Sequence, residues 1–101
     1  MVRVLSTKEF DTWERFLPKE YQQQIENIIE QLKKTTNVGK PLGYPFFREK
    51  KMGKYRIYFL VYEDIQVVLL ITISDKKAQQ ETIDKIKNHL DYYKDLIKKN
   101  L

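Results

Sequence analysis

Residues 46–62 constrain the fold more than any other part of the chain, because they predict a β-hairpin. Gly53 stands near the middle of this stretch, and a run of β-branched and aromatic residues follows it. Such runs on either side of a short turn with glycine are typical of two antiparallel strands. The part between Arg48 and Arg56 also carries five basic residues and a single acid, Glu49. We therefore expect a hairpin that presents positive charge beside aromatic rings.

The net charge of +5 comes from the centre of the chain. Residues 1–35 hold six basic and six acidic residues, and residues 63–101 hold seven of each. Residues 36–62 hold six basic residues against Glu49 alone. A solvated face without a partner is the ordinary explanation of a basic run, but surface lysines placed at random would spread out. The distribution favours a surface for a polyanion such as nucleic acid.

The composition predicts one globular domain and excludes several kinds of site. The chain has 101 residues, of which 42% are hydrophobic and 33% charged. It has no cysteine, so disulfides and thiolate metal sites are excluded, and its one histidine, His89, excludes a multi-histidine site. We expect no metal and no cofactor. No signal-peptide pattern opens the chain, and the longest apolar run, Val67–Ile71, is too short to span a bilayer. A soluble cytoplasmic protein without a membrane partner is expected.

A short strand and two helices are expected before the hairpin. Residues 2–5 predict the strand. Ser6 and Glu9 follow with the spacing of a capping box, which starts a helix. Pro18 cannot continue that helix but suits the first turn of a second one, which stops near Gly39. The two helices form an antiparallel helical hairpin.

Three strands and a last helix complete the expected α+β fold. The strands are expected at about 44–51, 55–63 and 66–74, with turns short enough for antiparallel pairing. One helix over about 76–100 follows. It carries a narrow apolar seam, which packs on the domain or is offered to another chain. The seam consists of Ile83, Ile86, Leu90, Tyr93 and Ile97. The predicted architecture is a helical hairpin on a small antiparallel sheet, with a C-terminal helix, in one domain over 1–101.

The register of the hairpin decides which basic side chains share a face. With a three-residue turn, Lys50 lies opposite Arg56 and Arg48 lies opposite Tyr58, so these four side chains form the outer face. A shift by one residue would place Glu49 across from Arg56 and Lys51 on that face instead. The inner, apolar face then consists of Tyr55, Ile57, Phe59 and Val61 together with Val67, Leu69, Ile71 and Ile73.

The outer face has the residue types needed to hold and cleave RNA. An arginine can hold a phosphate with two donors and stays charged. A lysine of lowered pKa, or a tyrosine such as Tyr58, can take the proton of a ribose 2′-hydroxyl, which then attacks the adjacent phosphate without a metal. Lys54, Lys76 and Lys77, at the ends of strands, extend the basic surface. A protein that only binds nucleic acid needs the same charges, so both interpretations stay open.

Four motifs, in their order, resemble the RelE/ParE toxin superfamily. They are Pro41-Leu42-Gly43, the run Phe46–Lys50, the run Gly53–Tyr58 and a hydrophobic strand that ends in Ser74–Lys77. The order of the expected elements also resembles that family. The resemblance implies a RelE-like toxin of a type II toxin–antitoxin system. Such a toxin is an endoribonuclease that cuts mRNA on the ribosome, and a RelB-like antitoxin wraps and silences it. The alternative is the ParE branch, which acts on DNA gyrase and has no RNase activity.

The resemblance also implies roles for individual residues. Arg56 would hold the scissile phosphate, Arg48 and Lys50 would be the paired basic residues of the preceding strand, and Lys77 would be the basic residue after the last strand. These four are the expected catalytic residues. The expected RNA-binding residues are Lys51, Lys54, Tyr58 and Lys76. RelE-type nucleases often carry a tyrosine in the C-terminal segment, but the corresponding residues 82–83 include none, so no general base is assigned.

Overall fold

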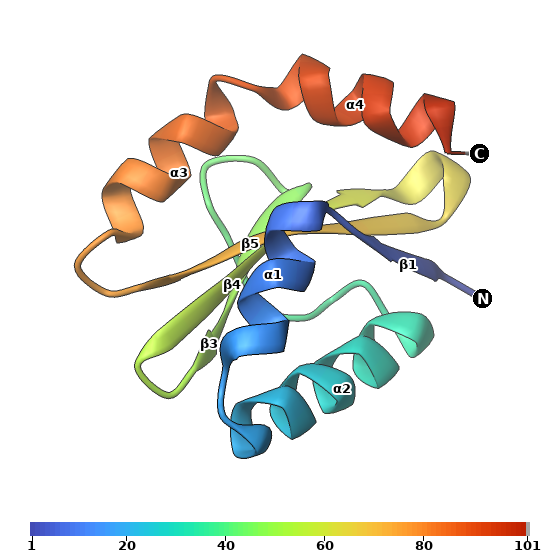
Figure 1. Ribbon diagram of the computed structural model, residues 1–101. Helices are drawn as coiled ribbons and strands as arrows, with labels where there is room; N and C mark the ends of the chain where they lie inside the picture. Colours follow the sequence, from blue (N-terminus) through green and yellow to red (C-terminus); the bar gives the residue numbers. More distant parts are fainter. Residues whose placement is uncertain (101) are drawn as a thin grey trace.

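The computed structural model describes residues 1–100 and shows a five-stranded sheet with helices on both faces (Figure 1). The strands lie in the order β1-β5-β4-β3-β2. They are β1 (Arg3–Ser6), β2 (Lys40–Pro41), β3 (Phe47–Met52), β4 (Tyr55–Tyr62) and β5 (Val67–Asp75). Helices α1 (Lys8–Phe16) and α2 (Lys19–Lys34) cover one face, and α3 (Gln79–Lys87) and α4 (Leu90–Lys99) cover the other. The predicted α+β class is confirmed.

The sheet is larger than expected, and it is mixed. β1 pairs in parallel with β5, so the N-terminal strand forms one edge of the sheet. The two residues of β2 pair with β3 and form the other edge. The remaining pairs are antiparallel, as the short turns predict. No helix within residues 1–100 is long and apolar enough to cross a membrane.

Helix α1 begins at a cap that differs from the predicted one. The Thr7 hydroxyl accepts a hydrogen bond from the Phe10 amide at 3.1 Å and donates one to the Ile71 carbonyl at 2.6 Å. The predicted cap, Ser6, instead donates to the Asp11 carboxylate. Thr7 therefore satisfies one of the free amides at the start of α1 and fastens the helix to β5. Pro18 separates α1 from α2 as expected.

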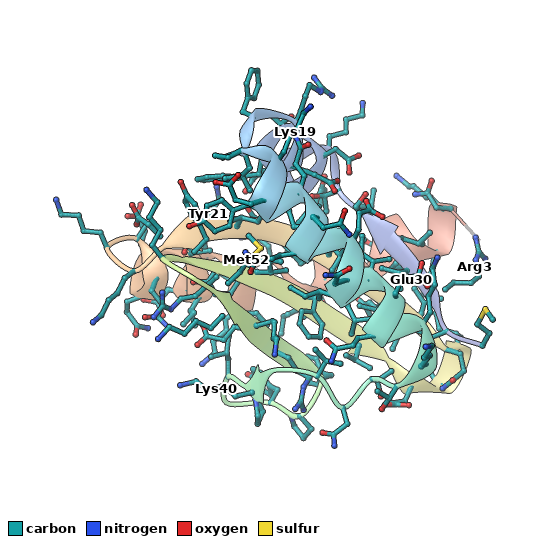
Figure 2. All side chains as sticks on the ribbon, turned by 90° about the horizontal axis from the view of Figure 1, so that it is seen from below. Arg3, Lys19, Tyr21, Glu30, Lys40 and Met52 are labelled. Carbon is teal, nitrogen blue, oxygen red and sulfur yellow. The ribbon has the colours of Figure 1, made fainter. Side chains whose placement is uncertain are left out.

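The hairpin turns one residue more tightly than predicted. Met52 pairs with Tyr55, so the loop contains only Gly53 and Lys54. Gly53 has a positive φ of 61°, as the first position of a type II′ turn requires, and glycine adopts it without steric cost. Met52 then points into the core beneath α2, beside Tyr21 (Figure 2). The predicted three-residue turn was wrong. The shorter loop buries Met52 and places Gly53 at the turn position that requires a positive φ.

The shorter turn changes the face of every residue in β3. Lys51 now lies opposite Arg56, and Glu49 lies opposite Tyr58. Lys50, which was expected opposite Arg56, pairs with Ile57 instead. Because alternate residues point to opposite faces, a shift by one residue moves the whole strand to the other face. The predicted outer face is therefore wrong for β3.

A β-bulge interrupts the pairing of β4 with β5. Tyr58 pairs with Thr72 but Phe59 pairs with Leu70, which leaves Ile71 as an extra residue. Two residues of β5 then oppose one of β4, and the alternation of faces resets at that point. The predicted inner face consequently breaks up. The side chains of Val67, Leu69 and Ile71 pack under α3 and α4, whereas that of Ile73 packs under α1 and α2.

Two helices replace the single helix expected over about 76–100. The break lies at Asn88 and His89, between α3 and α4. The His89 amide donates to the Ile86 carbonyl three residues back, and the His89 ring nitrogen Nδ1 lies 2.7 Å from the Lys85 carbonyl oxygen. The side chain thus occupies the carbonyl that a continuing helix would use. The predicted seam packs against the sheet through Ile83, Ile86, Leu90, Tyr93 and Ile97.

We predict that Gly39→Ala destabilises the protein more than Gly43→Ala does. Both glycines have positive φ, which costs about 1–2 kcal/mol for alanine. A Cβ at Gly39 would also lie 2.1 Å from the backbone oxygen of Glu49, whereas at Gly43 the nearest atom is the flexible Lys87 amine at 2.9 Å. Urea denaturation of both variants measures the difference. Equal losses of unfolding free energy would contradict the close approach of the 39–49 backbones.

Candidate functional site

Arg56 lies at the centre of the candidate site, on the face of β4 that is turned towards α3. Its neighbours across the sheet are Lys51 on β3 and Ser74 on β5. The residue is only 9% exposed. Within residues 1–100 it forms no ion pair, and none of its nitrogen atoms is both buried and without a hydrogen-bond partner. The stem of Arg56 is therefore buried while its charged end remains open to solvent.

Several exposed lysines lie on the strands and strand ends next to Arg56. Lys51 lies beside it in register, whereas the amine of Lys54, in the turn, lies 5.4 Å from the centre of the Tyr55 ring, on the face of α1 and α2. Tyr55 pairs with Asp75. Lys54, which precedes Tyr55, and Lys76, which follows Asp75, therefore lie at the same end of two neighbouring strands. The Asp75 carboxylate accepts a hydrogen bond from the Ala78 amide at 2.9 Å and helps to start α3. We call Lys51, Arg56, Lys76 and Lys77 the basic cluster; its positive potential suits a phosphate.

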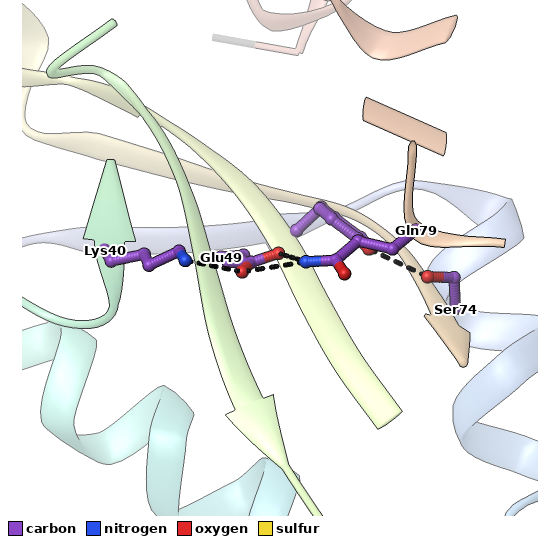
Figure 3. Close-up of polar contacts among 5 residues, drawn as sticks. Lys40, Glu49, Ser74 and Gln79 are labelled. Carbon is purple, nitrogen blue, oxygen red and sulfur yellow. Dashed lines mark hydrogen bonds and ion pairs between the residues drawn. The ribbon is translucent and has the colours of Figure 1, made fainter. Parts of the chain in front are cut away.

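A buried carboxylate lies on the same face as the basic cluster. Glu49, on β3, is 6% exposed. Its two carboxylate oxygens accept hydrogen bonds of 3.2 and 3.1 Å from the Gln79 side chain, and the Lys40 amine lies 3.9 Å away. Figure 3 shows Lys40 and Gln79 approaching Glu49 from opposite sides. Sequence reasoning missed this residue, although the alternative register contained the signal for it.

Tyr58 lies in the core next to the candidate site. Its ring is fully buried, and its hydroxyl shares a hydrogen bond with the Ser74 hydroxyl, with 2.8 Å between the two oxygens. Burial raises the pKa of the Tyr58 hydroxyl, while the hydrogen bond with Ser74 acts in the opposite direction. A tyrosine of raised pKa stays protonated near neutral pH, so Tyr58 is a poor proton acceptor there. Its buried ring does not form part of the RNA-facing surface that the sequence predicted.

Arg48 and Lys50 lie away from Arg56. The Arg48 guanidinium donates to the backbone carbonyls of Val38 at 2.8 Å, Gly39 at 3.0 Å and Pro45 at 3.3 Å. Those bonds use the donors that would otherwise hold a phosphate. Lys50 is half-buried on the face of α1 and α2. Of the two lysines that the sequence weighed for this face, the structure brings Lys51 to Arg56.

Two further observations bound the site. A hollow of about 770 Å³ between β1 and α4 has a mixed lining of apolar and polar residues, in which the one basic residue, Lys8, is balanced by Glu9, so it does not favour phosphates. Within residues 1–100, no three histidine, aspartate or glutamate side chains gather so as to hold a metal ion. The candidate site is thus an open basic surface around Arg56 with the Glu49 carboxylate beside it.

Comparison with known proteins shows a RelE-like fold. No family model matches the sequence, and no curated protein matches it. Among solved structures, the isolated E. coli RelE toxin is 16% identical with a TM-score of 0.66, covering 85% of this chain and 99% of that one. The RelB–RelE antitoxin–toxin complex from Methanococcus jannaschii gives 21% identity and a TM-score of 0.62, covering 77% and 96%. The RelBE2 toxin–antitoxin complex from Mycobacterium tuberculosis gives 18% and 0.64, covering 74% and 98%.

We predict that Arg48→Lys lowers the unfolding free energy by about 1.5–3 kcal/mol, the usual contribution of hydrogen bonds from a charged group. A lysine keeps the charge but cannot reach three carbonyls with one fork of donors. Arg15→Lys, on an exposed position of α1, is the matched control and should change little. Urea denaturation measures both. An Arg48→Lys variant as stable as Arg15→Lys would mean that Arg48 does not hold the 38–45 segment.

Proposed function

We propose that this protein is the toxin of a type II toxin–antitoxin module and cuts mRNA on the ribosome. The observation that carries the proposal is Arg56, a largely buried arginine that has no ion-pair partner within residues 1–100 and has the exposed Lys51 beside it in register. This placement of the arginine adds no ion pair to the fold, but it leaves the guanidinium able to bind a phosphate oxygen. The RelE-like fold supports the same conclusion.

The basic cluster performs the electrostatic part of the reaction. Arg56 donates two hydrogen bonds to the oxygens of the scissile phosphate, where negative charge increases in the transition state. Lys51 takes the place that the sequence gave to Lys50 and neutralises the same phosphate. Lys76 binds the flanking backbone, and Lys77 protonates the leaving 5′-oxygen. All of these steps use side chains of the chain itself.

Glu49 is the general base in this proposal. Its carboxylate takes the proton of the ribose 2′-hydroxyl, the 2′-oxygen attacks phosphorus, and the bond from phosphorus to the 5′-oxygen breaks. A proton from Lys77 completes the leaving hydroxyl, which leaves a 2′,3′-cyclic phosphate on the other product. The two hydrogen bonds from Gln79 fix the direction of the carboxylate, and each carboxylate oxygen has a second lone pair for the substrate.

The likeness to structures solved as RelB–RelE complexes supports a protein antitoxin as the partner. In the proposal a RelB-like antitoxin wraps this chain and covers the basic cluster. The ribosome with its mRNA is then the target, and the cytoplasm is the place of action. An antitoxin that reaches Arg56 would present a carboxylate to it, because the charged end of the arginine is open.

We predict that Arg56→Ala lowers the rate of mRNA cleavage by about 10²–10³-fold, as loss of one transition-state donor does. Arg56→Lys should retain part of the activity, because it keeps the charge but not the paired donors. The assay is primer extension on mRNA-programmed ribosomes, with Arg15→Ala as the control on the far helix. If the wild-type protein cuts nothing and instead blocks supercoiling by gyrase, the ParE-like alternative holds and the proposal fails.

We predict that Glu49→Gln lowers cleavage by about 10²–10⁴-fold, the usual contribution of a general base. Glutamine keeps the shape and one oxygen for Gln79, so the fold should stay intact, which circular dichroism and thermal unfolding check. Glu81→Gln, an exposed carboxylate on α3, serves as the matched control. A folded Glu49→Gln variant that cleaves at the wild-type rate would exclude Glu49 as the base and leave the role of Arg56 untouched.

A further inference from the structure

The loop between β2 and β3 presents two stacked aromatic rings at the surface. Tyr44 and Phe46 have ring centroids 4.9 Å apart and ring planes inclined by 24°. Tyr44 is 42% exposed and Phe46 is 38% exposed, so neither ring belongs to the core. Covering these rings with a ligand would be favourable, because it would remove apolar surface from water. We call the pair Tyr44 and Phe46 the aromatic platform.

The backbone around the platform is fixed by hydrogen bonds. The Leu42 amide donates to the Phe47 carbonyl at 2.8 Å, and the Phe47 amide donates to the Tyr44 carbonyl at 3.2 Å. The Phe46 carbonyl accepts from the Val61 amide at 2.7 Å, which joins the loop to β4. Arg48 holds the Pro45 carbonyl in addition. The rings are therefore pre-organised, and a ligand that stacks on them need not order the loop first.

The platform lies at the far end of α3 from the catalytic carboxylate. Gln79, the first residue of α3, binds Glu49, and Lys87, the last, has its amine 5.9 Å from the centre of the Tyr44 ring. Nine residues of α-helix separate these ends by about 12 Å. Figure 1 shows the loop before β3 beside the end of α3 that leads to α4. A polymer bound at Arg56 can thus extend along α3 to the platform.

The charges near the platform favour a nucleic acid over an apolar peptide. Lys87 stands over one ring, Lys40 opens the segment, and residues 40–48 contain no acid. Unpaired bases stack on aromatic side chains while neighbouring lysines hold their phosphates. Resting on the proposed function, we propose that Tyr44 and Phe46 stack an unpaired base of the RNA that Arg56 holds, with Lys87 at the adjoining phosphate.

The test compares intact and abasic RNA. The probe is a short, fluorescently labelled, single-stranded RNA with 2′-O-methyl groups, which binds but cannot be cleaved, and binding is read by fluorescence anisotropy. A second probe lacks the bases at successive positions but keeps every phosphate. Wild-type protein should bind the abasic probe about 5–150-fold more weakly, because stacking is worth about that factor per base.

The variants separate stacking from charge. The double variant Tyr44→Ala, Phe46→Ala should lose the same factor for the intact probe and should not distinguish the two probes. Tyr44→Phe should bind as the wild type does, because it keeps the ring, and Phe16→Ala removes an exposed ring on α1 as the matched control. Lys87→Ala should weaken both probes alike, since it removes a phosphate contact.

Two results would overturn the inference. One is a double variant that binds the intact probe as tightly as the wild type does. Loss of binding to a protein partner by the same variant would not restore the inference. The other is a wild-type protein that binds both probes equally. Failure of the proposed function is separate, because it shows in the ribosome assay. A protein that does not cleave mRNA but discriminates against the abasic probe would keep the platform and lose the nuclease.

Discussion

The two-residue turn at Gly53 and Lys54 is the constraint on which the rest of the structure depends. It fixes the pairing of β3 with β4, and so it decides which residues of β3 face α1 and α2 and which face α3. With this register, Met52 enters the core and Lys51 reaches Arg56. A loop one residue longer would send Met52 to the surface and Glu49 into the apolar core. Burial of one methionine and exclusion of one carboxylate from apolar surroundings therefore select the face that carries the site.

Two arginines in neighbouring strands differ in what their guanidinium groups contact. Arg48 gives its donors to three carbonyls of the 38–45 segment, which contains little regular structure and would otherwise leave those acceptors to water. Arg56 is more deeply buried than Arg48, and it gives no hydrogen bond or ion pair to a neighbour within residues 1–100. Sequence position alone does not separate them, because both stand in the same basic run. The distinction appears only when the partners of each guanidinium are counted.

Most elements were predictable from the sequence, whereas the faces of β3 and of much of β5 were not. Local signals are strong where they depend on a few adjacent residues: Pro18 between two helices, the apolar runs of β4 and β5, and the apolar spacing of the last helices. The face of a strand depends on a loop length and on bulges, and both follow from packing between distant segments. The extra residue Ile71 illustrates this, because nothing in its own neighbourhood distinguishes it from Leu69. Glu49 was missed for the same reason, since the predicted register turned it away from Arg56.

The break at His89 links the two ends of the proposed RNA path. An uninterrupted helix over residues 76–100 would be about 37 Å long, which exceeds the longest extent of the molecule, 33 Å. Part of its apolar seam would then project beyond the sheet. The break lets α3 and α4 bend over the sheet, as Figure 1 shows, so that Ile86 and Ile97 are both buried. It also ends α3 at Lys87. The first residue of α3, Gln79, binds Glu49, and the last, Lys87, has its amine over the Tyr44 ring. The nine residues of α3 therefore set the spacing between the carboxylate that we propose as the base and the aromatic platform.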